Sequence, residues 1–469
     1  MAATSSELSN ISSPTGNRMP AANSSQGTRD GSLDAAYERY LRLSDLAKLW
    51  SSRDFPHWRN EAILKPAIQA LEITFRLISI ALSDPRSYSN IREWNRRLEY
   101  LAAGEIELIG DFCEGEKGAG APVVDLRFSA GVLARDRSSN EVWQLPGGAG
   151  AVVSRTSEEG LLPRLAAWEK SKDIAGKIRF QIESRMQGCP FTLGLGEPNF
   201  AGKPILDYDI VVRPSELHVL KKSPFENVNN HENQKLFTIQ QILETWLAAA
   251  RELARRIGDR IDSSDWAAAA DDCWLLERIW KLLAEITDLY LLMDPDDLLR
   301  LKAQLAIRAS TGSEAFCFRS ALLREVTAAS AKELKRRVPS VLGAEADPSG
   351  GPRLQEAAMR LFHGRQRGEN GNPGRIHLLQ AFQAVEAAVK RFYFGYRQVV
   401  TATMGSLEAT ACRPLAVSPE ADDSLSLMFL EPAYFPSLDA AKTFLGELWQ
   451  NEQRRRSGGR TDGRCGARQ

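Results

Sequence analysis

Three segments of the chain carry apolar side chains at alternating spacings of three and four residues, the repeat of one face of an α-helix. They run from Leu64 to Leu82, from Leu276 to Met293 and from Leu378 to Val399. The last is the most regular, with apolar residues at Leu378, Phe382, Val385, Val389, Phe392, Tyr396 and Val399. An apolar stripe has to be covered, so these helices must pack on one another. The sequence therefore predicts an all-α fold, a multi-helix bundle.

Further helices are expected along most of the chain, and strands almost nowhere. The helical segments lie near residues 33–50, 90–110, 163–186, 234–261, 318–337, 352–362 and 437–455. Alternating apolar residues, the signal of a strand, are short and confined to the surroundings of Val211 and Met428. No sheet is therefore predicted.

The predicted helix from Leu276 also carries charged and aromatic residues outside its stripe. Glu277 and Lys281 are four residues apart, a spacing that favours an ion pair, and they belong to a face expected to meet solvent. Trp274 and Trp280 are six residues apart and lie on different faces. Core packing is expected for both, and an exposed aromatic patch for a protein partner is the alternative.

Changes in composition divide the chain into regions. Residues 114–160 are rich in Gly and Ala and have no helical period, and residues 188–232 are rich in Gly, Pro and Asn. The predicted regions are a disordered tail (1–32), an N-terminal helical region (33–187) with a flexible insertion (114–160), an ordered connecting loop (188–232), a C-terminal helical region (233–455) and a basic disordered tail (456–469).

The charge balance excludes functions that depend on broad electrostatic attraction. Lys plus Arg and Asp plus Glu are each 60, so the formal net charge is zero. Neither nucleic acid nor an anionic membrane is then expected as the main partner. Six cysteines without a CxxC pair are typical of reduced thiols and favour a cytoplasmic location. The basic run at Arg454–Arg456 leaves the nucleus as an alternative.

No segment is expected to cross a membrane. The most apolar segment, residues 63–82, is interrupted by four polar residues: Lys65, Gln69, Glu72 and Arg76. A bilayer-spanning helix needs about 20 consecutive, mainly apolar residues. No apolar secretory core follows Met1 either.

Two segments that resemble ligand sites are better explained as local structure. The glycine-rich run from Gly194 to Pro204 lacks both the glycine spacing and the final Ser or Thr of a phosphate loop, which favours a structural turn. Asp294, followed by Pro295, Asp296 and Asp297, has the pattern of a helix cap rather than a metal site.

The sequence offers no catalytic or metal-binding set. None of the five histidines forms an HxH or HxxxH pair, and no GxSxG turn occurs. We therefore expect no catalytic residues, no metal and no cofactor, and the chain is predicted not to be an enzyme.

Several long stretches are similar to the plant nematode-resistance protein-like HSPRO family. They include YERYLRLSDLAKLWSS, NEAILKPAIQALEITFRLISIALSDPR, GCPFTLGLGEPNFAGKP, NHENQKLFTIQQILETW and LLERIWKLLAEITDLYLLMDPDDL. The resemblance covers most of residues 36–112 and 161–449. It does not extend to the insertion around 114–160 or to the arginine-rich tail.

The resemblance implies a non-enzymatic protein of plant defence and stress signalling, a regulator of basal resistance to pathogens including nematodes. It further implies binding to the sucrose-non-fermenting-related protein kinase complex through its regulatory beta-gamma subunit. The family supplies no catalytic residues that map onto this chain.

The alternative hypothesis is a haem-binding dioxygenase-like protein or haem sensor. The C-terminal half resembles the helical tryptophan and indoleamine dioxygenase fold, in which an axial histidine lies nine residues before a glycine. Counting back from Gly405 gives Tyr396, and Gly-Ser-Leu-Glu stands where those enzymes have a glycine turn. Tyrosine can ligate haem iron, so Tyr396 is the candidate contact in this alternative.

One regulatory site is suggested within the insertion. Ser138 has Leu133 five residues before it, Arg135 three before it and Val142 four after it, which resembles the substrate pattern of that kinase family. Phosphorylation would add about −1.5 to −2 charge beside two arginines.

Overall fold

The computed structural model defines the fold over most of the chain between Ala35 and Met404. The described residues are 37–55, 58–86, 90–114, 134–135, 142–144, 151–153, 157–197, 205–224, 231–297, 320–344, 356–361 and 373–404, with the single residues Ala35, Lys203 and Leu354. Helices dominate this part of the chain, so the predicted all-α class is confirmed. Similarity to the dioxygenase fold is not shown.

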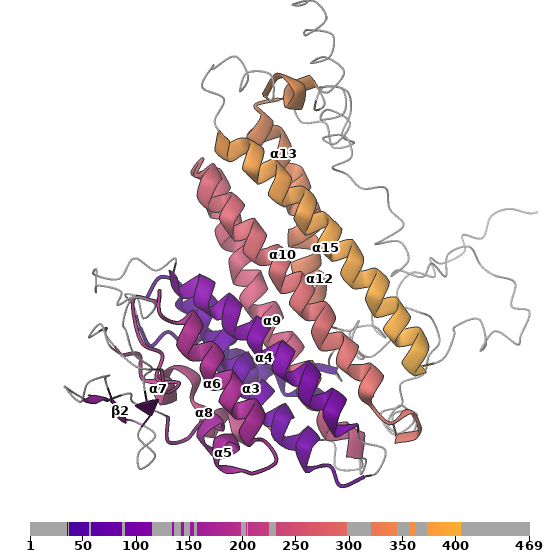
Figure 1. The fold of residues 1–469 in the computed structure, drawn as a ribbon. Coiled ribbons are helices and arrows are strands. Elements are labelled where there is room, and N and C mark those ends of the chain that lie inside the picture. Colours follow the sequence, from indigo (N-terminus) through magenta and orange to yellow (C-terminus); the bar gives the residue numbers. More distant parts are fainter. Residues whose placement is uncertain are drawn as a thin grey trace, which may run out of the picture.

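The N-terminal part is built around two long antiparallel helices (Figure 1). Its helices are α2 (Leu43–Ser51), α3 (Glu61–Ser83), α4 (Ile91–Glu114), α5 (Leu162–Ala167), α6 (Lys172–Arg185), α7 (Tyr208–Val212) and α8 (Pro214–Val219). Helix α3 is the centre, because it packs against α4 on one side and against α9 of the C-terminal part on another. Helix α6 packs on α4.

The C-terminal part is a bundle of long helices (Figure 1). Its elements are α9 (His231–Asp262), α10 (Trp266–Asp288), the 3₁₀ turn η1 (Leu289–Leu292), α12 (Ala321–Ala328), the π-helical turn η4 (Ala329–Glu333), α13 (Leu334–Leu342) and α15 (Pro373–Met404). Helices α10 and α15 pack along each other, and they carry two of the predicted stripes. All three stripes lie in helices and are buried, as predicted.

One large apolar core joins the two parts, beside a small second cluster of Tyr37, Tyr40, Leu41 and Phe237. The large core runs without a break from Leu46 on α2 to Val399 on α15. Helix α3 is long and apolar enough by length and composition to cross a membrane, but 83% of its apolar window is buried inside the protein. The core helix of a folded protein has this property, and α3 is such a helix.

The structure adds a small sheet that the sequence did not predict. Strands β1 (Ala134–Arg135), β2 (Val142–Gln144) and β3 (Ala151–Val153) pair antiparallel in the order β1-β2-β3. Each strand has two or three residues, too few for an alternating pattern to be recognised. The short strand candidate near Val211 is wrong: this residue lies in α7, where its buried side chain supports a short helix. The candidate near Met428 lies outside the described residues.

The predicted charged face of α10 is only partly correct. Lys281 does pair with Glu277 at 2.7 Å. However, Glu277 is only 8% exposed. Burial raises the pKa of Glu285 to about 7. The cause is α4, which packs against this side of α10 and brings the backbone of Gly104 close to Glu285.

Candidate functional site

A buried polar stripe runs along α3. Its members are the residues that interrupt the apolar run: Lys65, Gln69, Glu72 and Arg76. Their spacings of four, three and four are helical, so the four side chains share one face of α3. In sequence they look like breaks in an apolar segment, whereas in the structure they form a second, polar face.

Glu72 is the centre of this stripe, and its carboxylate is fully buried. One oxygen, Oε1, accepts the backbone N–H of Leu161 at 2.8 Å and lies 2.8 Å from Nε2 of His218. The other, Oε2, accepts the hydroxyl of Tyr208 at 2.7 Å. Burial, followed by the charge of Glu72, raises the pKa of Tyr208 well above its usual value. These bonds hold Leu161, at the start of α5, and the helices α7 and α8 against α3.

The neighbouring polar residues of α3 bind the same segment. Gln69 donates to the carbonyl of Val212, at the end of α7, at 3.3 Å. Arg76 donates to the carbonyl of Leu217, in α8, at 3.4 Å. Because buried polar groups need partners, the stripe fixes where this segment lies. It also explains how the two short helices α7 and α8 are held in place within a region rich in Gly and Pro.

The described start of the glycine-rich run, residues 194–197, forms a structural turn, in agreement with that interpretation. Gly194 and Gly196 have φ values of 77° and 97°, a region that favours glycine. The carboxylate of Glu197 accepts the N–H groups of Gly194 at 3.2 Å and Leu195 at 2.8 Å, as well as that of Leu193. Convergent N–H groups of this kind bind anions, and here the anion is the chain's own carboxylate.

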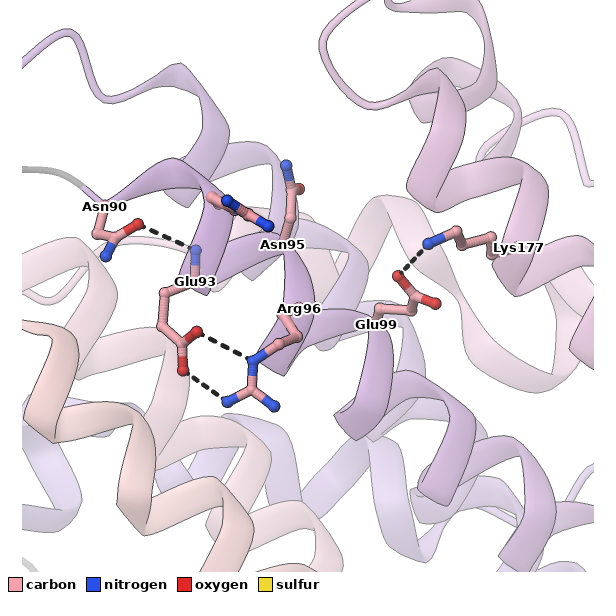
Figure 2. A pocket seen from close by; sticks show the side chains of 7 residues that line it. Asn90, Glu93, Asn95, Arg96, Glu99 and Lys177 are labelled. Atoms are coloured by element: carbon pink, nitrogen blue, oxygen red, sulfur yellow. Dashed lines mark hydrogen bonds and ion pairs between the residues drawn. The ribbon is translucent and has the colours of Figure 1, made fainter.

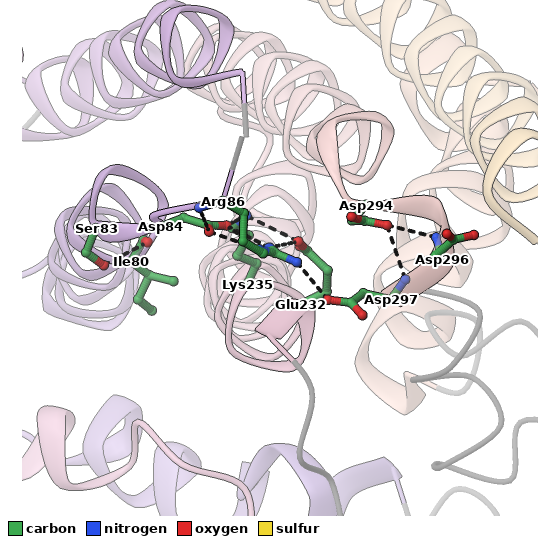
Figure 3. A network of polar contacts seen from close by, with 9 residues as sticks. All are labelled: Ile80, Ser83, Asp84, Arg86, Glu232, Lys235, Asp294, Asp296 and Asp297. Carbon is green, nitrogen blue, oxygen red and sulfur yellow. Dashed lines mark hydrogen bonds and ion pairs between the residues drawn. The ribbon is translucent and has the colours of Figure 1, made fainter. Parts of the chain in front are cut away.

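The acidic run after α10 is a helix cap, as predicted. Oδ1 of Asp294 accepts the N–H groups of Asp296 at 2.9 Å and Asp297 at 3.3 Å (Figure 3). The carboxylate of Asp294 therefore satisfies backbone donors at the start of a helical turn. Asp297 has a different role, because its carboxylate pairs with Arg86, an arginine of the N-terminal part.

That arginine, Arg86, joins three elements of the fold (Figure 3). It pairs with Asp84 at 2.6 Å, with Asp297 at 2.7 Å and with Glu232, at the start of α9. Lys235 completes the network, bonding Asp84 at 2.8 Å. Hydrogen bonds from Arg86 and Lys235 hold the pKa of Asp84 well below its usual range. The network ties the end of α3 to both α9 and the turn after α10.

A polar groove of about 320 Å³ opens on the surface between α4 and α6 (Figure 2). Asn90 caps α4 by accepting the N–H of Glu93 at 3.1 Å. Glu93 in turn pairs with Arg96 at 2.7 Å. On the far side, Lys177 of α6 pairs with Glu99 of α4 at 2.7 Å. This groove is not predictable from the sequence, because Lys177 and the α4 residues are about 80 positions apart and only the fold brings them together.

The residue proposed as a haem contact is a packing residue in the structure. Tyr396 is 2% exposed, and its ring stacks on Phe392 at 5.8 Å between centroids. Phe392 also packs against Trp280 and Tyr393. This aromatic cluster lies between α10 and α15 and occupies the space beside Tyr396. The haem alternative gains no support from it and stays a prediction.

The remaining sequence-predicted features are resolved only in part. Ser138 lies outside the described residues. Within the described ranges, no group of three or more His, Cys, Asp or Glu side chains is placed to hold a metal ion. Cys113, Cys189 and Cys273 are buried free thiols. Trp280 is buried, as expected, but Trp274 is 44% exposed.

The fold and its surface define a class of protein, a helical bundle with buried polar contacts between its helices and a polar groove on the outside. Comparison with known families assigns it further. The family model described as the Hs1pro-1 N-terminus matches residues 1–183, and the model described as the Hs1pro-1 protein C-terminus matches residues 186–451. The chain belongs to this nematode-resistance protein-like HSPRO family.

Two curated relatives from Arabidopsis thaliana match along most of their length. One is named "Nematode resistance protein-like HSPRO2" and is 50% identical over 420 residues, which cover 89% of this chain and 88% of the relative. The other is named "Nematode resistance protein-like HSPRO1" and is 47% identical over 444 residues, 94% of both chains. No solved structure matches the chain. The names of these relatives support a role related to plant defence.

Proposed function

We propose that this chain is a non-enzymatic interaction protein of plant defence and stress signalling. It regulates basal resistance to pathogens, including nematodes, by binding the sucrose-non-fermenting-related protein kinase complex. The observation that carries the defence role is its extensive identity to two relatives named for nematode resistance. The kinase partner comes from the family resemblance. Its contact is expected on the regulatory beta-gamma subunit, in the cytoplasm.

The structure supports a surface mechanism rather than an interior reaction centre. The buried carboxylate of Glu72 is engaged by Leu161, Tyr208 and His218. The carboxylate of Glu197 is likewise engaged by its own backbone turn. Groups used in this way stabilise the fold. The outer surface, in contrast, carries exposed aromatic side chains such as Trp274 and a polar groove, which are features of protein recognition.

The direct test is binding of the purified full-length chain to the reconstituted kinase complex. Biolayer interferometry is run with the complete complex and with a complex that lacks the regulatory beta-gamma subunit. We expect binding at micromolar concentration or tighter to the first and loss of binding to the second. Equal binding to both would move the contact to another subunit. No binding to either would contradict the kinase part of the proposal.

The same complex tests the proposed phosphorylation of Ser138. The chain is incubated with active kinase and ATP and then analysed by peptide mass spectrometry. We expect phosphate on Ser138 and none on the corresponding peptide of a Ser138→Ala variant. An unmodified Ser138 under conditions in which a known peptide substrate is fully phosphorylated would contradict this site.

A further inference from the structure

The groove between α4 and α6 has an excess of positive charge. Its lining includes the cations Arg92, Arg96 and Lys177 and the anions Glu93 and Glu99. Both anions are already engaged, since Glu93 bonds Arg96 and Glu99 bonds Lys177 (Figure 2). One lining cation is therefore left over after the pairs are counted. A second arginine from outside the lining, Arg97, also bonds Glu93 at 2.9 Å and further reduces its negative field.

Two lining side chains have hydrogen-bonding capacity to spare. Within the described ranges, the guanidinium of the exposed residue Arg92 has neither a hydrogen bond nor an ion pair. The side-chain carbonyl of Asn95 is shielded from solvent, and its NH2 group has no hydrogen bond within the same ranges. Arg92 offers a planar fork that matches a carboxylate, and the NH2 group of Asn95 can donate a hydrogen bond. The groove can therefore bind a carboxylate and a neighbouring acceptor such as a peptide carbonyl.

Apolar side chains flank these polar groups. Tyr100 is 65% exposed and lies on the helical stripe that continues from Arg92 and Arg96 at four-residue steps. On α6, Phe180 is 66% exposed and lies three residues after Lys177. Exposed aromatic side chains beside a charged groove are typical of protein-recognition surfaces.

We propose that this groove binds an acidic peptide segment of a protein partner. A carboxylate of the segment pairs with Arg92, its backbone meets the amide of Asn95, and an apolar side chain lies against Tyr100 and Phe180. The carboxylates of Glu93 and Glu99 in the lining disfavour a dianionic phosphate, whereas singly charged and spaced carboxylates fit between them. The choice of a protein as the partner rests on the proposed function.

The groove is tested first with a defined probe. Fluorescence anisotropy measures binding of a labelled peptide in which glutamate alternates with leucine, and of the same peptide with glutamine in place of glutamate. We expect the glutamate peptide to bind about tenfold more tightly. Arg92→Glu should weaken its binding by about tenfold or more, because it replaces attraction by repulsion. Phe180→Ala should weaken the binding of both peptides, because it removes an apolar contact that does not depend on charge.

The matched control is Arg53, which lies in the segment before the start of α3, whereas the groove residues of α4 follow the end of α3. Arg53 is also exposed and is separated from the groove by the length of α3, roughly 30 Å. Arg53→Glu has the same charge change and should leave peptide binding unchanged. An equal loss of peptide binding in Arg92→Glu and Arg53→Glu would overturn the groove as the binding site. Equal binding of the glutamate and glutamine peptides would also overturn it. Binding of phosphatidylserine vesicles but not of peptide, lost in Arg92→Glu, would overturn the peptide class.

The kinase complex separates this inference from the function on which it rests. If the unaltered chain and Arg53→Glu bind the complex and Arg92→Glu binds at least about tenfold more weakly, both are supported. If all three bind equally, the groove inference fails and the proposed function stands. If the unaltered chain does not bind the complex, the proposed kinase partner fails, and the peptide measurement alone decides the groove.

Discussion

Trp246, on α9, donates its indole N–H to Oε1 of Glu105, on α4, at 2.8 Å. The same oxygen accepts the hydroxyl of Thr74, on α3, at 3.1 Å. The carboxyl group thus joins three helices at a point where its exposure is zero. Its second oxygen, Oε2, has no partner among the described residues. Burial raises the pKa of Glu105 to about 8.

The raised pKa of Glu105 makes the stability of the protein depend on pH. The folded state keeps the proton up to about pH 8, whereas the unfolded state releases it near the ordinary value of 4.5. The free energy of unfolding should therefore fall as the pH rises from about 4.5 to about 8. Glu105→Gln stays neutral at every pH, so it should remove this part of the fall. At pH 8 its free energy of unfolding should be a few kcal/mol higher than that of the unaltered protein.

Urea denaturation from pH 5 to pH 8.5 measures this effect. The control is Glu93→Gln, since Glu93 lies in an exposed ion pair and its pKa is lowered by Arg96 and Arg97. That variant should not flatten the pH profile. A Glu105→Gln profile with the slope of the unaltered protein would contradict the assignment.

Removing the hydroxyl of Tyr208 should destabilise the fold. Tyr208→Phe leaves Oε2 of the buried Glu72 without its 2.7 Å donor, which we expect to cost about 1–2 kcal/mol of unfolding free energy. Tyr100→Phe is the matched control, because Tyr100 is 65% exposed and its change should stay within about 0.5 kcal/mol. Urea denaturation followed by circular dichroism compares the two. Equal losses would mean that the Glu72 contact contributes nothing.

Arg86→Ala should weaken the tie between the two parts of the fold. The variant leaves Asp84, Asp297 and the buried Glu232 without the cation that they share. We expect it to lower the free energy of unfolding by about 3 kcal/mol. Arg336→Ala breaks an exposed pair with Glu333 and should cost less than about 1 kcal/mol. The measurement is the urea midpoint of each variant. A loss for Arg86→Ala no larger than the control would show that the network is not needed.

The two tryptophans of α10 should respond very differently to truncation. Trp280 is fully buried, and its indole N–H donates to Ser330 at 3.0 Å, so Trp280→Ala should cost about 4 kcal/mol. Trp274, on the same helix and 44% exposed, should tolerate alanine with a loss of about 1 kcal/mol or less. Thermal unfolding monitored by circular dichroism makes the comparison. Similar losses for the two would contradict the packing described for α10.

The sequence predicted the helices where periodicity was strong. The stripe beginning at Leu64 lies in α3, the one at Leu276 in α10 and the η1 turn that follows it, and the one at Leu378 in α15. Burial of one face leaves a clear three-and-four repeat in the sequence. The cap at Asp294 and the turn at Gly194 were also predictable, since both use contacts between residues at most four positions apart. Contacts of this kind join residues that are close in the chain, so the sequence alone indicates them.

Other features could not be predicted, because they depend on which elements meet. Gln69, Glu72 and Arg76 already had helical spacing in the sequence, but nothing there showed that the segment with Tyr208 would contact them. The charged face of α10 looked like a solvent face in the sequence, whereas in the structure α4 packs against it at Glu285.

The sequence by itself determined the class of fold, the family and the positions of the main helices, because apolar period and helix caps act over a few residues. Only the tertiary structure decided that Trp280 is buried while Trp274 is exposed, that Arg86 reaches Asp297, and that Lys177 closes a groove along α4. These contacts join residues far apart in the chain. They form only when helices pack, since neither partner carries a local signal for the other.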